Sequence, residues 1–485
     1  MDIKKNLKVL LVVPNFRWCE WNKNTLWHYI PYNFCLLASM VIDKCDVKIL
    51  DANLLNLTED DFKCELSRLK PDLVGITVLM DQYGTSGHKA AELAKSYDKE
   101  TVVIMGGVYA TTNSQKVMED PNIDYAVIGE GEYVFRDFIG YCLGKNLLPV
   151  KGISYRSKGK VIHTGHSEFI KDLDALPLPA YHLIDFDKYA NNAHRKSVDS
   201  PRKYPYARIL TSRGCPYECV FCQVEEISGR KIRYRSSENV LEEIKWLKDK
   251  YNVQSLIFDD DNLFLNKKRA NKIFQGMIDR NLVMPWVAIA VAVFALDEEL
   301  IKLMRASGCE YIDIAIESGS QRVLKEIINK PVNLEQAKEM NRIARKEGIY
   351  VAANFIIGFP GETWDEIRET IKFAEDINVD YMKLFAAIPL RNTELWKLCE
   401  KEGMFRKNYG KSTAQWSSGQ INTNEFTAND ITILRAFEWE RINFADKEKR
   451  KRTAAMLDIT KEELLKIRKK TIRDVVHLIS NNSKA

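Results

Sequence analysis

The sequence predicts an α/β protein with two successive parallel-sheet domains and a helical C-terminal segment. Short apolar runs alternate with stretches of helical periodicity, this alternation occurs in two separate blocks, and beyond Gly403 only helical periodicity remains. We expect four segments, at residues 1–145, 146–205, 206–400 and 401–485. A chain of 485 residues has room for several such units.

The composition excludes several classes of protein. A hydrophobic content of 45% and a charged content of 29% are those of an ordinary globular protein, and a net charge of +5 gives no argument for a nucleic acid or an anionic membrane as partner. No apolar run approaches the roughly 20 residues that cross a bilayer, and Val9–Val13 is too short for a signal peptide. Ten cysteines, most of them scattered, indicate a reducing cytoplasm.

The first block predicts a doubly wound, Rossmann-like sheet. Its expected strands are Leu7–Val13, Asp46–Leu50, Leu73–Leu79, Val102–Met105 and Tyr125–Ile128. Ligands of such sheets bind at the carboxyl ends of the strands, where glycines let a backbone approach a ligand or simply form turns. No G-x-G-x-x-G follows the first strand, so a dinucleotide fingerprint is absent. The candidate ligand-facing residues are Asn15, Thr77, Gly106, Gly107, Val108, Gly129 and Glu130.

The second block predicts six strand–helix units, fewer than the eight that close a full barrel. Its expected strands are Arg208–Thr211, Ser255–Phe258, Ala288–Val293, Tyr311–Ala315, Val351–Ile357 and Lys383–Ile388. A partial (β/α)6 barrel fits this count, with its chemistry at the carboxyl ends of the strands. Between the two blocks, Gly152–Tyr155 and the apolar pair at 161–162 indicate a small hairpin.

A cysteine motif, C-x3-C-x2-C, follows the first strand of the second block at Cys215, Cys219 and Cys222. Three thiolates so close together can hold three irons of a [4Fe–4S] cluster and leave the fourth iron open to a ligand. A structural zinc site would need a fourth ligand, and three is an odd number for disulfides. The alternative is three unrelated buried cysteines.

The run Gly214–Cys222 closely resembles the cluster loop of radical S-adenosylmethionine (SAM) enzymes. In that family the open iron takes the amino and carboxylate groups of SAM, and the reduced cluster cleaves SAM to a 5′-deoxyadenosyl radical. The resemblance implies that the three cysteines ligate the cluster, with Tyr217 and Phe221 beside it. It also implies an external electron donor, such as a flavodoxin or a ferredoxin.

Three further phrases at strand ends resemble SAM-facing phrases of the same family. Asp259–Asn262 stands where a contact to the SAM amino group is expected, Ile316–Ser320 resembles the ribose-contacting phrase, and Asn354–Thr363 resembles the phrase that borders the adenine. A solvated acidic loop is the alternative for the first phrase, and a charge at a helix N-terminus is the alternative for Glu362. The implied SAM contacts are Asp260 or Asp261, Glu317, Ser318, Gly358 and Glu362.

The strand-end phrases Met105–Thr111 and Ile128–Glu132 resemble the N-terminal cobalamin-binding domain of one large class of radical SAM enzymes. Many cobalamin domains carry D-x-H-x-x-G, whose histidine ligates cobalt. The corresponding stretch here, Asp81–His88, does not fit that motif, which this class usually lacks. The resemblance therefore implies cobalamin without a cobalt ligand from that motif, and we expect His88 only to start a helix.

Two groups of aromatic residues leave alternatives open. Trp439 and Asn443 share one helical face, which packs against the barrel or forms a cap over its mouth. Trp18, Trp21 and Trp27 follow the first strand. They pack against the second domain, or at least one of them covers the upper face of the cobalt.

Together these resemblances imply a cobalamin-dependent radical SAM methyltransferase that acts on an unactivated carbon of a small-molecule or natural-product substrate. In the class mechanism one SAM methylates the cobalamin, and a second yields the radical that abstracts a substrate hydrogen. The same cofactors also serve oxidation, cyclisation or ring rearrangement without methyl transfer. A non-catalytic corrinoid or iron–sulfur carrier is the alternative from another class, but a carrier would not need the SAM-facing phrases.

Overall fold

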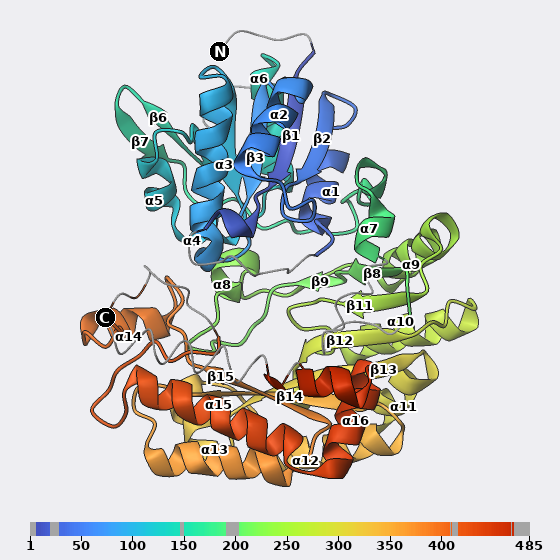
Figure 1. The fold of residues 1–485 in the computed structure, drawn as a ribbon. Coiled ribbons are helices and arrows are strands. Elements are labelled where there is room, and N and C mark those ends of the chain that lie inside the picture. Colours follow the sequence, from blue (N-terminus) through green and yellow to red (C-terminus); the bar gives the residue numbers. More distant parts are fainter. Residues whose placement is uncertain are drawn as a thin grey trace. The chain divides into compact units, whose positions relative to one another are not determined.

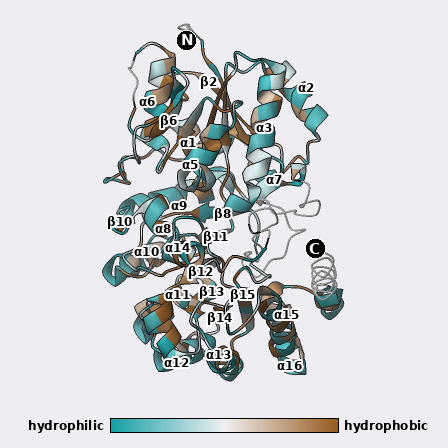
Figure 2. Cartoon of the chain, turned by 90° about the vertical axis from the view of Figure 1, so that its left-hand side faces the viewer, coloured by the Kyte–Doolittle hydropathy of each residue, from teal (hydrophilic) through white to brown (hydrophobic). Residues whose placement is uncertain are grey.

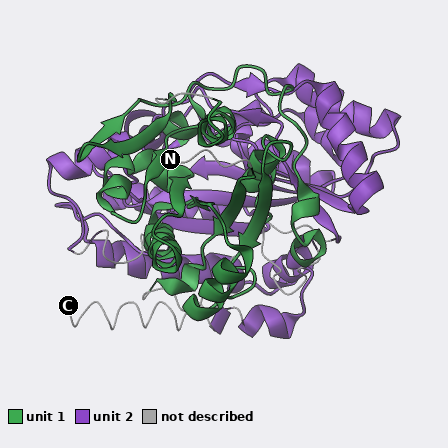
Figure 3. Cartoon of the chain, turned by 90° about the horizontal axis from the view of Figure 1, so that it is seen from above, with its two compact units in different colours: residues 1–189, 224–229 green, residues 190–223, 230–485 purple. Residues whose placement is uncertain are grey.

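The computed structural model describes residues 6–19, 29–145, 150–190, 203–407, 409, 416–466 and 468–469. The chain divides into two compact units, which consist of residues 1–189 with 224–229 (unit 1) and residues 190–223 with 230–485 (unit 2) (Figure 3). Both units contain a parallel sheet covered by helices, and the C-terminal segment is helical, which confirms the predicted α/β class. In the described part of the chain, no helix is long and apolar enough to cross a bilayer.

Unit 1 is built on a seven-stranded sheet in the order β2-β1-β3-β4-β5-β6-β7 (Figure 1). Its strands are β1 (Lys8–Val13), β2 (Asp46–Asp51), β3 (Leu73–Thr77), β4 (Val102–Gly106), β5 (Tyr125–Val127), β6 (Ile153–Ser157) and β7 (Lys160–His163). Its helices are α1 (Tyr32–Ser39), α2 (Glu59–Leu69), α3 (Gly84–Tyr97), α4 (Val108–Thr112), α5 (Ser114–Glu119), α6 (Glu132–Cys142) and α8 (Val224–Ser228), and α7 (Phe186–Ala190) ends at the unit boundary. The first five strands run parallel, and β6 and β7 form an antiparallel hairpin that pairs with β5.

Helices cover both faces of this sheet because its central strands, β1, β3 and β4, are apolar at nearly every position. Along β1, Leu10 and Val12 belong to the core shared with α2 and α3, whereas Val9 and Leu11 belong to the core shared with α1 and α6. A strand buried on both faces needs apolar residues throughout, so it shows a continuous run and no alternation. The five predicted strands and the predicted hairpin all occur, and the hairpin extends the sheet of unit 1.

Unit 2 contains a six-stranded parallel sheet in the order β15-β14-β13-β12-β11-β8, beside a short antiparallel pair, β9 and β10. Its strands are β8 (Tyr206–Ile209), β9 (Ser212–Arg213), β10 (Arg233–Tyr234), β11 (Ser255–Phe258), β12 (Trp286–Val291), β13 (Cys309–Glu317), β14 (Tyr350–Ile357) and β15 (Tyr381–Ala386). Its helices are α9 (Ser237–Tyr251), α10 (Lys267–Asp279), α11 (Glu298–Ala306), α12 (Leu334–Lys346), α13 (Trp364–Asp376), α14 (Glu394–Lys401), α15 (Ala428–Phe444) and α16 (Lys447–Leu457). The strands follow one another in chain order, as expected of the predicted partial barrel.

The helices of unit 2 are amphipathic. Along α12, Ala337, Met340 and Ile343 are buried, and the charged residues between them give the outside of the helix its teal colour in Figure 2. Buried residues at this spacing lie on one face of a helix, so α12 turns a single apolar stripe inward. The sequence pattern that predicted α12 is therefore the same pattern that attaches it to the unit.

The C-terminal helix α15 covers β15, the last strand of this sheet. The Asn443 side chain accepts a hydrogen bond from Met382 N and donates one to Met382 O, both at 2.8 Å. Arg435 Nε donates to a second backbone carbonyl of β15 at 2.6 Å. Trp439 is 5% exposed and contacts the same strand through its ring. Trp439 and Asn443 thus pack against the barrel, which is the first of the two alternatives for this face.

Candidate active site

The three motif cysteines lie on the loop that follows β8 and β9. Cys215, Cys219 and Cys222 are partly exposed and form no disulfide bond, and Cys222 N donates to Cys219 O at 3.0 Å. Burial raises the pKa of the Cys219 thiol to about 12, and the charges of Cys222 and Cys215 raise it further, so the three sulfur atoms share one electrostatic environment. Over the described residues, no three His, Cys, Asp or Glu side chains are arranged to hold a single metal ion.

The acidic run after β11 holds the start of this loop. Asp260 Oδ1 accepts hydrogen bonds from the N and Oγ1 atoms of Thr211, at 2.9 and 2.8 Å, and from Ser212 Oγ at 2.6 Å. Asp261 Oδ2 accepts a hydrogen bond from Gly214 N at 2.8 Å. These side chains therefore fix the backbone that leads to the first cysteine. We refer to Asp260 and Asp261 together as the acidic clasp.

Two buried oxygen atoms in this run make no hydrogen bond to any described residue: Asp260 Oδ2 and Asn262 Oδ1. Burial raises the pKa of the Asp260 carboxyl to about 6, and the hydrogen bonds from Ser212 and Thr211 oppose this shift. Asn262 Nδ2 contacts Cys215 Sγ at 3.8 Å, which places this residue beside the cluster loop. A buried acceptor without a donor is destabilising, so both atoms are suited to a bound group that carries N–H or O–H donors.

A turn after β13 holds the middle of the cluster loop. Val220 N donates to Ile328 O at 3.1 Å, and Asn329 Nδ2 donates to Glu218 O at 3.4 Å. The turn ends a π-helical stretch, Val323–Ile328, a local structure often found at functional sites. The cluster loop is therefore held from two sides, by β11 and by β13.

Glu317 and Lys330 form a buried ion pair at the end of β13. Lys330 Nζ lies 2.6 Å from Glu317 Oε1, and the two side chains are 10% and 8% exposed. The positive charge of Lys330 opposes the rise in the pKa of Cys219, so the pair is close to the cluster loop. Ser318 Oγ is buried and lies 2.9 Å from Thr370 Oγ1 in α13. The expected SAM contacts of Glu317 and Ser318 stay predictions, because both side chains already have partners inside unit 2.

Lys330 was missed by the sequence reasoning. It stands alone in a loop between a predicted strand and a predicted helix, and a single lysine without a pattern gives no signal of its position. Only the folded chain shows that it meets Glu317.

The two aromatic residues of the motif pack against residues at other strand ends. The rings of Tyr217 and Phe294 have centroids 4.9 Å apart, and those of Phe221 and Phe359 are 6.0 Å apart. Phe294 follows β12 and Phe359 follows β14, so these contacts attach the loop to two more strands of the sheet. The predicted position of both rings beside the cluster stays a prediction.

Glu362 closes the loop after β14. Its Oε2 atom accepts hydrogen bonds from Gly358 N at 2.7 Å and Phe359 N at 3.0 Å, whereas Oε1 is buried and meets no donor from the described residues. Burial raises the pKa of this carboxyl to about 7, and the two backbone bonds oppose the rise. Thr363 and Glu366 form the capping box of α13, so Glu362 itself closes the strand-to-helix turn, and its expected SAM contact stays a prediction.

The loop after β1 in unit 1 is held by Asn15, a predicted ligand-facing residue. Its Oδ1 atom accepts hydrogen bonds from the N and Nε atoms of Arg17, both at 3.0 Å, and its Nδ2 atom donates to Leu57 O at 2.9 Å. The side chain is 2% exposed. Asn15 therefore supports this loop from inside the unit.

The two glycines at the end of β4 differ in the space that a Cβ atom would find. At Gly107 φ is +90°, and a Cβ atom would lie 2.7 Å from Val78 O and 2.9 Å from Thr77 Oγ1. Side chains rarely adopt that backbone angle, so unit 1 itself requires glycine there. At Gly106 the nearest atom to a Cβ would be 3.7 Å away, which is an ordinary contact, so among the described residues none excludes a Cβ atom there. Val108 directly follows and begins α4.

The loop after β5 is packed against the segment that follows the hairpin. Gly129 N donates to Thr111 Oγ1 at 3.0 Å, φ at Gly129 is +91°, and a Cβ atom would lie 2.2 Å from His166 Cε1. Glu130 Oε2 accepts a hydrogen bond from Ile170 N at 2.6 Å. The structural-turn alternative thus accounts for Gly129 and Gly107, but not for Gly106.

His88 is the fifth residue of α3 and has partners at both ring nitrogens. Nδ1 lies 2.7 Å from Asp120 Oδ2, and Nε2 lies 3.0 Å from Tyr109 OH. The expectation that His88 only starts a helix is therefore wrong, because its ring joins α3 to Asp120 and Tyr109. That it does not ligate cobalt stays a prediction.

Trp18 packs within unit 1. Its Nε1 atom donates to Leu57 O at 3.0 Å, and its ring lies 5.2 Å from that of Phe62 in α2. Trp21 and Trp27 lie outside the described residues. For Trp18 these contacts support a structural role, whereas the proposed cover over the cobalt stays a prediction.

Comparisons with known protein families agree with this arrangement. Residues 209–374 match the family model described as the radical SAM superfamily, and residues 27–139 match the B12 binding domain. The first match contains the cysteine loop and the strand ends that hold it. The second contains strands β2 to β5 of the sheet of unit 1.

Two relatives cover most of the chain. An uncharacterised methyltransferase of Pyrococcus horikoshii is 35% identical over 76% of this chain and 78% of its own length. The cytidylyl-2-hydroxyethylphosphonate methyltransferase of Streptomyces wedmorensis is 31% identical over 76% of this chain and 73% of its own length.

A solved structure has the same fold. The cobalamin-dependent S-adenosylmethionine radical enzyme OxsB, with aqua-cobalamin and S-adenosylmethionine bound, aligns with a TM-score of 0.70 over 98% of this chain and 81% of its own, at 18% identity. The two domain models and the two methyltransferase relatives show that the chain belongs to the cobalamin-dependent radical SAM methyltransferases, whose cofactors are a [4Fe–4S] cluster, SAM and cobalamin.

Proposed function

We propose that the chain methylates an unactivated carbon of a small-molecule or natural-product substrate in the cytoplasm. One observation carries the proposal: a loop with three cysteines outside any disulfide, held by the strand ends of a partial barrel, occurs in one chain with a unit that matches the B12 binding domain. The Streptomyces wedmorensis relative is named for a small phosphonate, which supports a small-molecule substrate. None of the ten cysteines forms a disulfide bond, which suits a reducing compartment.

The residues of unit 2 fit the cluster and SAM. Cys215, Cys219 and Cys222 would each ligate one iron, and the unpartnered Asp260 Oδ2 would accept a donor from the SAM amino group. When bound, these two cofactors supply the radical that removes a hydrogen atom from the substrate. The further residues that we propose around SAM are Asp261, Glu317, Ser318, Gly358 and Glu362.

The residues of unit 1 fit cobalamin. At Gly106 no described residue would meet a Cβ atom closer than 3.7 Å, so a glycine at the end of β4 is better explained by a large ring that lies against the backbone there. When bound, cobalamin supplies the transferred methyl group. The residues that we propose to shape this site, directly or by holding its loops, are Asn15, Thr77, Gly106, Gly107, Val108, Gly129 and Glu130.

The chain's own residues position these groups and exclude water. The acidic clasp fixes the backbone before the first cysteine, and Glu362 fixes the loop after β14. Tyr217 and Phe221 cover the cluster loop with rings that are themselves held by other aromatic residues. The chemistry is the cofactors' own, so the contribution of these side chains is a fixed geometry.

We further propose that an acidic electron carrier, such as a flavodoxin or ferredoxin, docks beside the cluster loop. A cavity of about 470 Å³ lies there, lined on one side by the loop residues Tyr217 and Glu218 and on the other by Lys325 and Lys330. Within the described part of the chain, Lys325 has no ion-pair partner, so its charge can meet an acidic partner. Lys325→Glu should slow reduction by flavodoxin and leave reduction by dithionite unchanged, whereas Lys401→Glu on α14 should change neither.

The methylation itself is tested with the reconstituted, reduced protein, SAM that carries a deuterated methyl group, and candidate small molecules. Mass spectrometry should show a product heavier by the labelled methyl group, together with 5′-deoxyadenosine. A product without the label would identify oxidation, cyclisation or rearrangement and overturn the proposed reaction. Absence of 5′-deoxyadenosine from a protein with a full cluster would argue for a carrier.

A further inference from the structure

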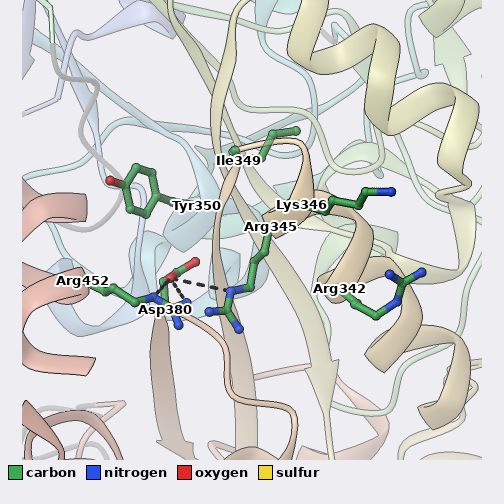
Figure 4. A pocket seen from close by; sticks show the side chains of 8 residues that line it. Arg342, Arg345, Lys346, Ile349, Tyr350, Asp380 and Arg452 are labelled. Atoms are coloured by element: carbon green, nitrogen blue, oxygen red, sulfur yellow. Dashed lines mark hydrogen bonds and ion pairs between the residues drawn. The ribbon is translucent and has the colours of Figure 1, made fainter. Parts of the chain in front are cut away.

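A second polar cavity lies at the opposite end of the barrel strands from the cysteine loop. Its volume is about 500 Å³, within the range of small-ligand sites. It is lined by the last turn of α12, by the residues that lead into β14 and β15, and by α16. The lining residues are Arg342, Arg345, Lys346, Gly348, Ile349, Tyr350, Asp380 and Arg452 (Figure 4). Since the cluster loop follows the carboxyl end of β8, this cavity is separate from the cluster loop.

The lining carries four cations and one carboxylate, which leaves an excess of three positive charges. Asp380 is 3% exposed and accepts hydrogen bonds from Arg452 Nε at 2.8 Å and Val351 N at 2.9 Å, and Arg345 Nε lies 3.9 Å from its Oδ1 atom. One carboxylate thus serves two guanidinium groups. Figure 4 shows both groups converging on Asp380, whereas Arg342 and Lys346 extend away from it.

A further cation, which is itself buried, increases the charge around Asp380. Lys449 in α16 is 8% exposed, and Asp380 and Arg345 are the charged groups that act on it most strongly. Burial lowers the pKa of Lys449 to about 8, Asp380 opposes the change, and repulsion from Arg345 adds to it.

The two outer cations differ in how far their charge is neutralised. Arg342 pairs with Glu339 at 2.6 Å on the exposed side of α12, and within the described residues Lys346 has no ion-pair partner. Arginine presents a planar fork of donors that matches phosphate oxygens, and lysine adds a mobile point charge. Asp380 holds two of the forks in fixed positions, so little side-chain freedom is lost when an anion arrives.

We propose that this cavity binds a small anion with two or more phosphate groups, such as diphosphate or a nucleoside polyphosphate. An anion of this kind carries about the charge that the lining leaves unbalanced, because each phosphate group bears roughly one to two negative charges near neutral pH. The lining also offers Ile349 and the ring of Tyr350 to a base or another apolar part of the ligand. Because the site is remote from the cluster loop, its occupant is a ligand in addition to the methylation substrate.

The test is isothermal titration calorimetry of the full reconstituted chain with phosphate, diphosphate and ATP at constant ionic strength. We expect diphosphate and ATP to bind at least tenfold more tightly than phosphate. The double variant Arg342→Gln, Lys346→Gln should weaken both by tenfold or more. These two side chains are on the surface, so the variant should keep the unfolding temperature of the parent.

The matched control is Lys338→Gln, which removes a cation of the same helix that pairs with Glu335 outside the cavity. It should bind both anions as the parent does. Equal affinity for diphosphate and ATP would identify the phosphates as the recognised group. Tighter binding of ATP would show that the apolar lining also contacts the nucleoside. Both results support the site. No binding of diphosphate or ATP, or equal weakening by the control variant, would overturn it.

Discussion

The ends of the strands are fixed in different ways in the two units. In unit 2, carboxylate side chains hold the loops at the strand ends: Asp260 and Asp261 hold the cysteine loop, and Glu362 holds the loop after β14. In unit 1, the backbone itself comes close, and Gly107 and Gly129 have positive φ angles with no room for a Cβ atom. The stability of a loop held by carboxylates depends on their protonation and on individual hydrogen bonds. The stability of a close backbone contact depends only on the absence of a side chain. The two units should therefore fail under different changes.

The largest effect is expected from the cluster loop. Replacing Cys215, Cys219 and Cys222 together with Ala should reduce iron from about four per chain to none and abolish 5′-deoxyadenosine formation, because each thiolate holds one iron. Iron analysis and electron paramagnetic resonance of the reconstituted protein measure this. The control is Cys64→Ala, which removes an exposed thiol of unit 1. A cluster that survives in the triple variant would mean that other cysteines ligate it.

The next effect separates the neighbouring glycines of β4. Gly107→Ala should destabilise unit 1 by more than about 3 kcal/mol, because it combines a backbone angle that only glycine adopts readily with a contact of 2.7 Å to Val78 O. Gly106→Ala should leave the unfolding temperature unchanged and weaken hydroxocobalamin binding. Thermal unfolding and absorbance titrations measure the two effects. Unchanged cobalamin binding by Gly106→Ala would remove this glycine from the proposed site.

Removal of a carboxylate from the acidic clasp should destabilise unit 2, as loss of a glycine destabilises unit 1. Asp260→Ala removes three hydrogen bonds to a buried carboxylate and should destabilise unit 2 by about 3 kcal/mol, with a lower iron content after reconstitution. Asp260→Asn keeps an acceptor oxygen and should retain most of the cluster. If both variants assemble a full cluster with an unchanged resonance spectrum, the clasp does not position the loop.

Glu362 gives the polar contacts a pH dependence. Its pKa is raised to about 7, so the folded chain holds this proton more tightly than the unfolded chain, and stability falls as pH rises from about 4.5 to about 7. Glu362→Gln keeps an acceptor for the two backbone donors and removes this loss, which is about 3 kcal/mol. The difference in unfolding temperature between variant and parent should therefore grow over this pH range and then level off.

Glu366 is the control of opposite sign. The side chain of Arg322 lowers the pKa of Glu366 to about 2, so its contribution to stability is present above pH 4.5 and is lost as pH falls towards 2. Glu366→Gln should therefore differ most from the parent near pH 7 and least in acid. A flat difference for Glu362→Gln would show that its carboxyl titrates normally.

The smallest effect is expected at His88. His88→Ala should leave the visible spectrum of bound cobalamin unchanged, because both ring nitrogens are engaged by Asp120 and Tyr109. The lost hydrogen bonds should lower the stability of unit 1 by only about 1–2 kcal/mol. A shifted cobalt spectrum would show that His88 reaches the metal.

The apolar runs predicted the strands of both sheets and their parallel direction, because a strand buried on two faces must be apolar throughout. The spacing of the cysteines predicted the cluster loop for a similar reason, since one loop has to bring three thiols to one centre. Lys330 and Arg452 could not be predicted in this way. Their partners, Glu317 and Asp380, are 13 and 72 residues distant in the sequence, and no periodicity records such pairs.

The contact of α15 with β15 has a consequence for how far the sheet can grow. The last strand of an open sheet presents N–H and C=O groups that can recruit a strand from another molecule. Here Asn443 uses both groups of Met382, and Arg435 uses the carbonyl of Leu384. The helix α15 therefore prevents another strand from pairing with β15. A chain shortened before residue 428 would expose this edge and should aggregate more readily.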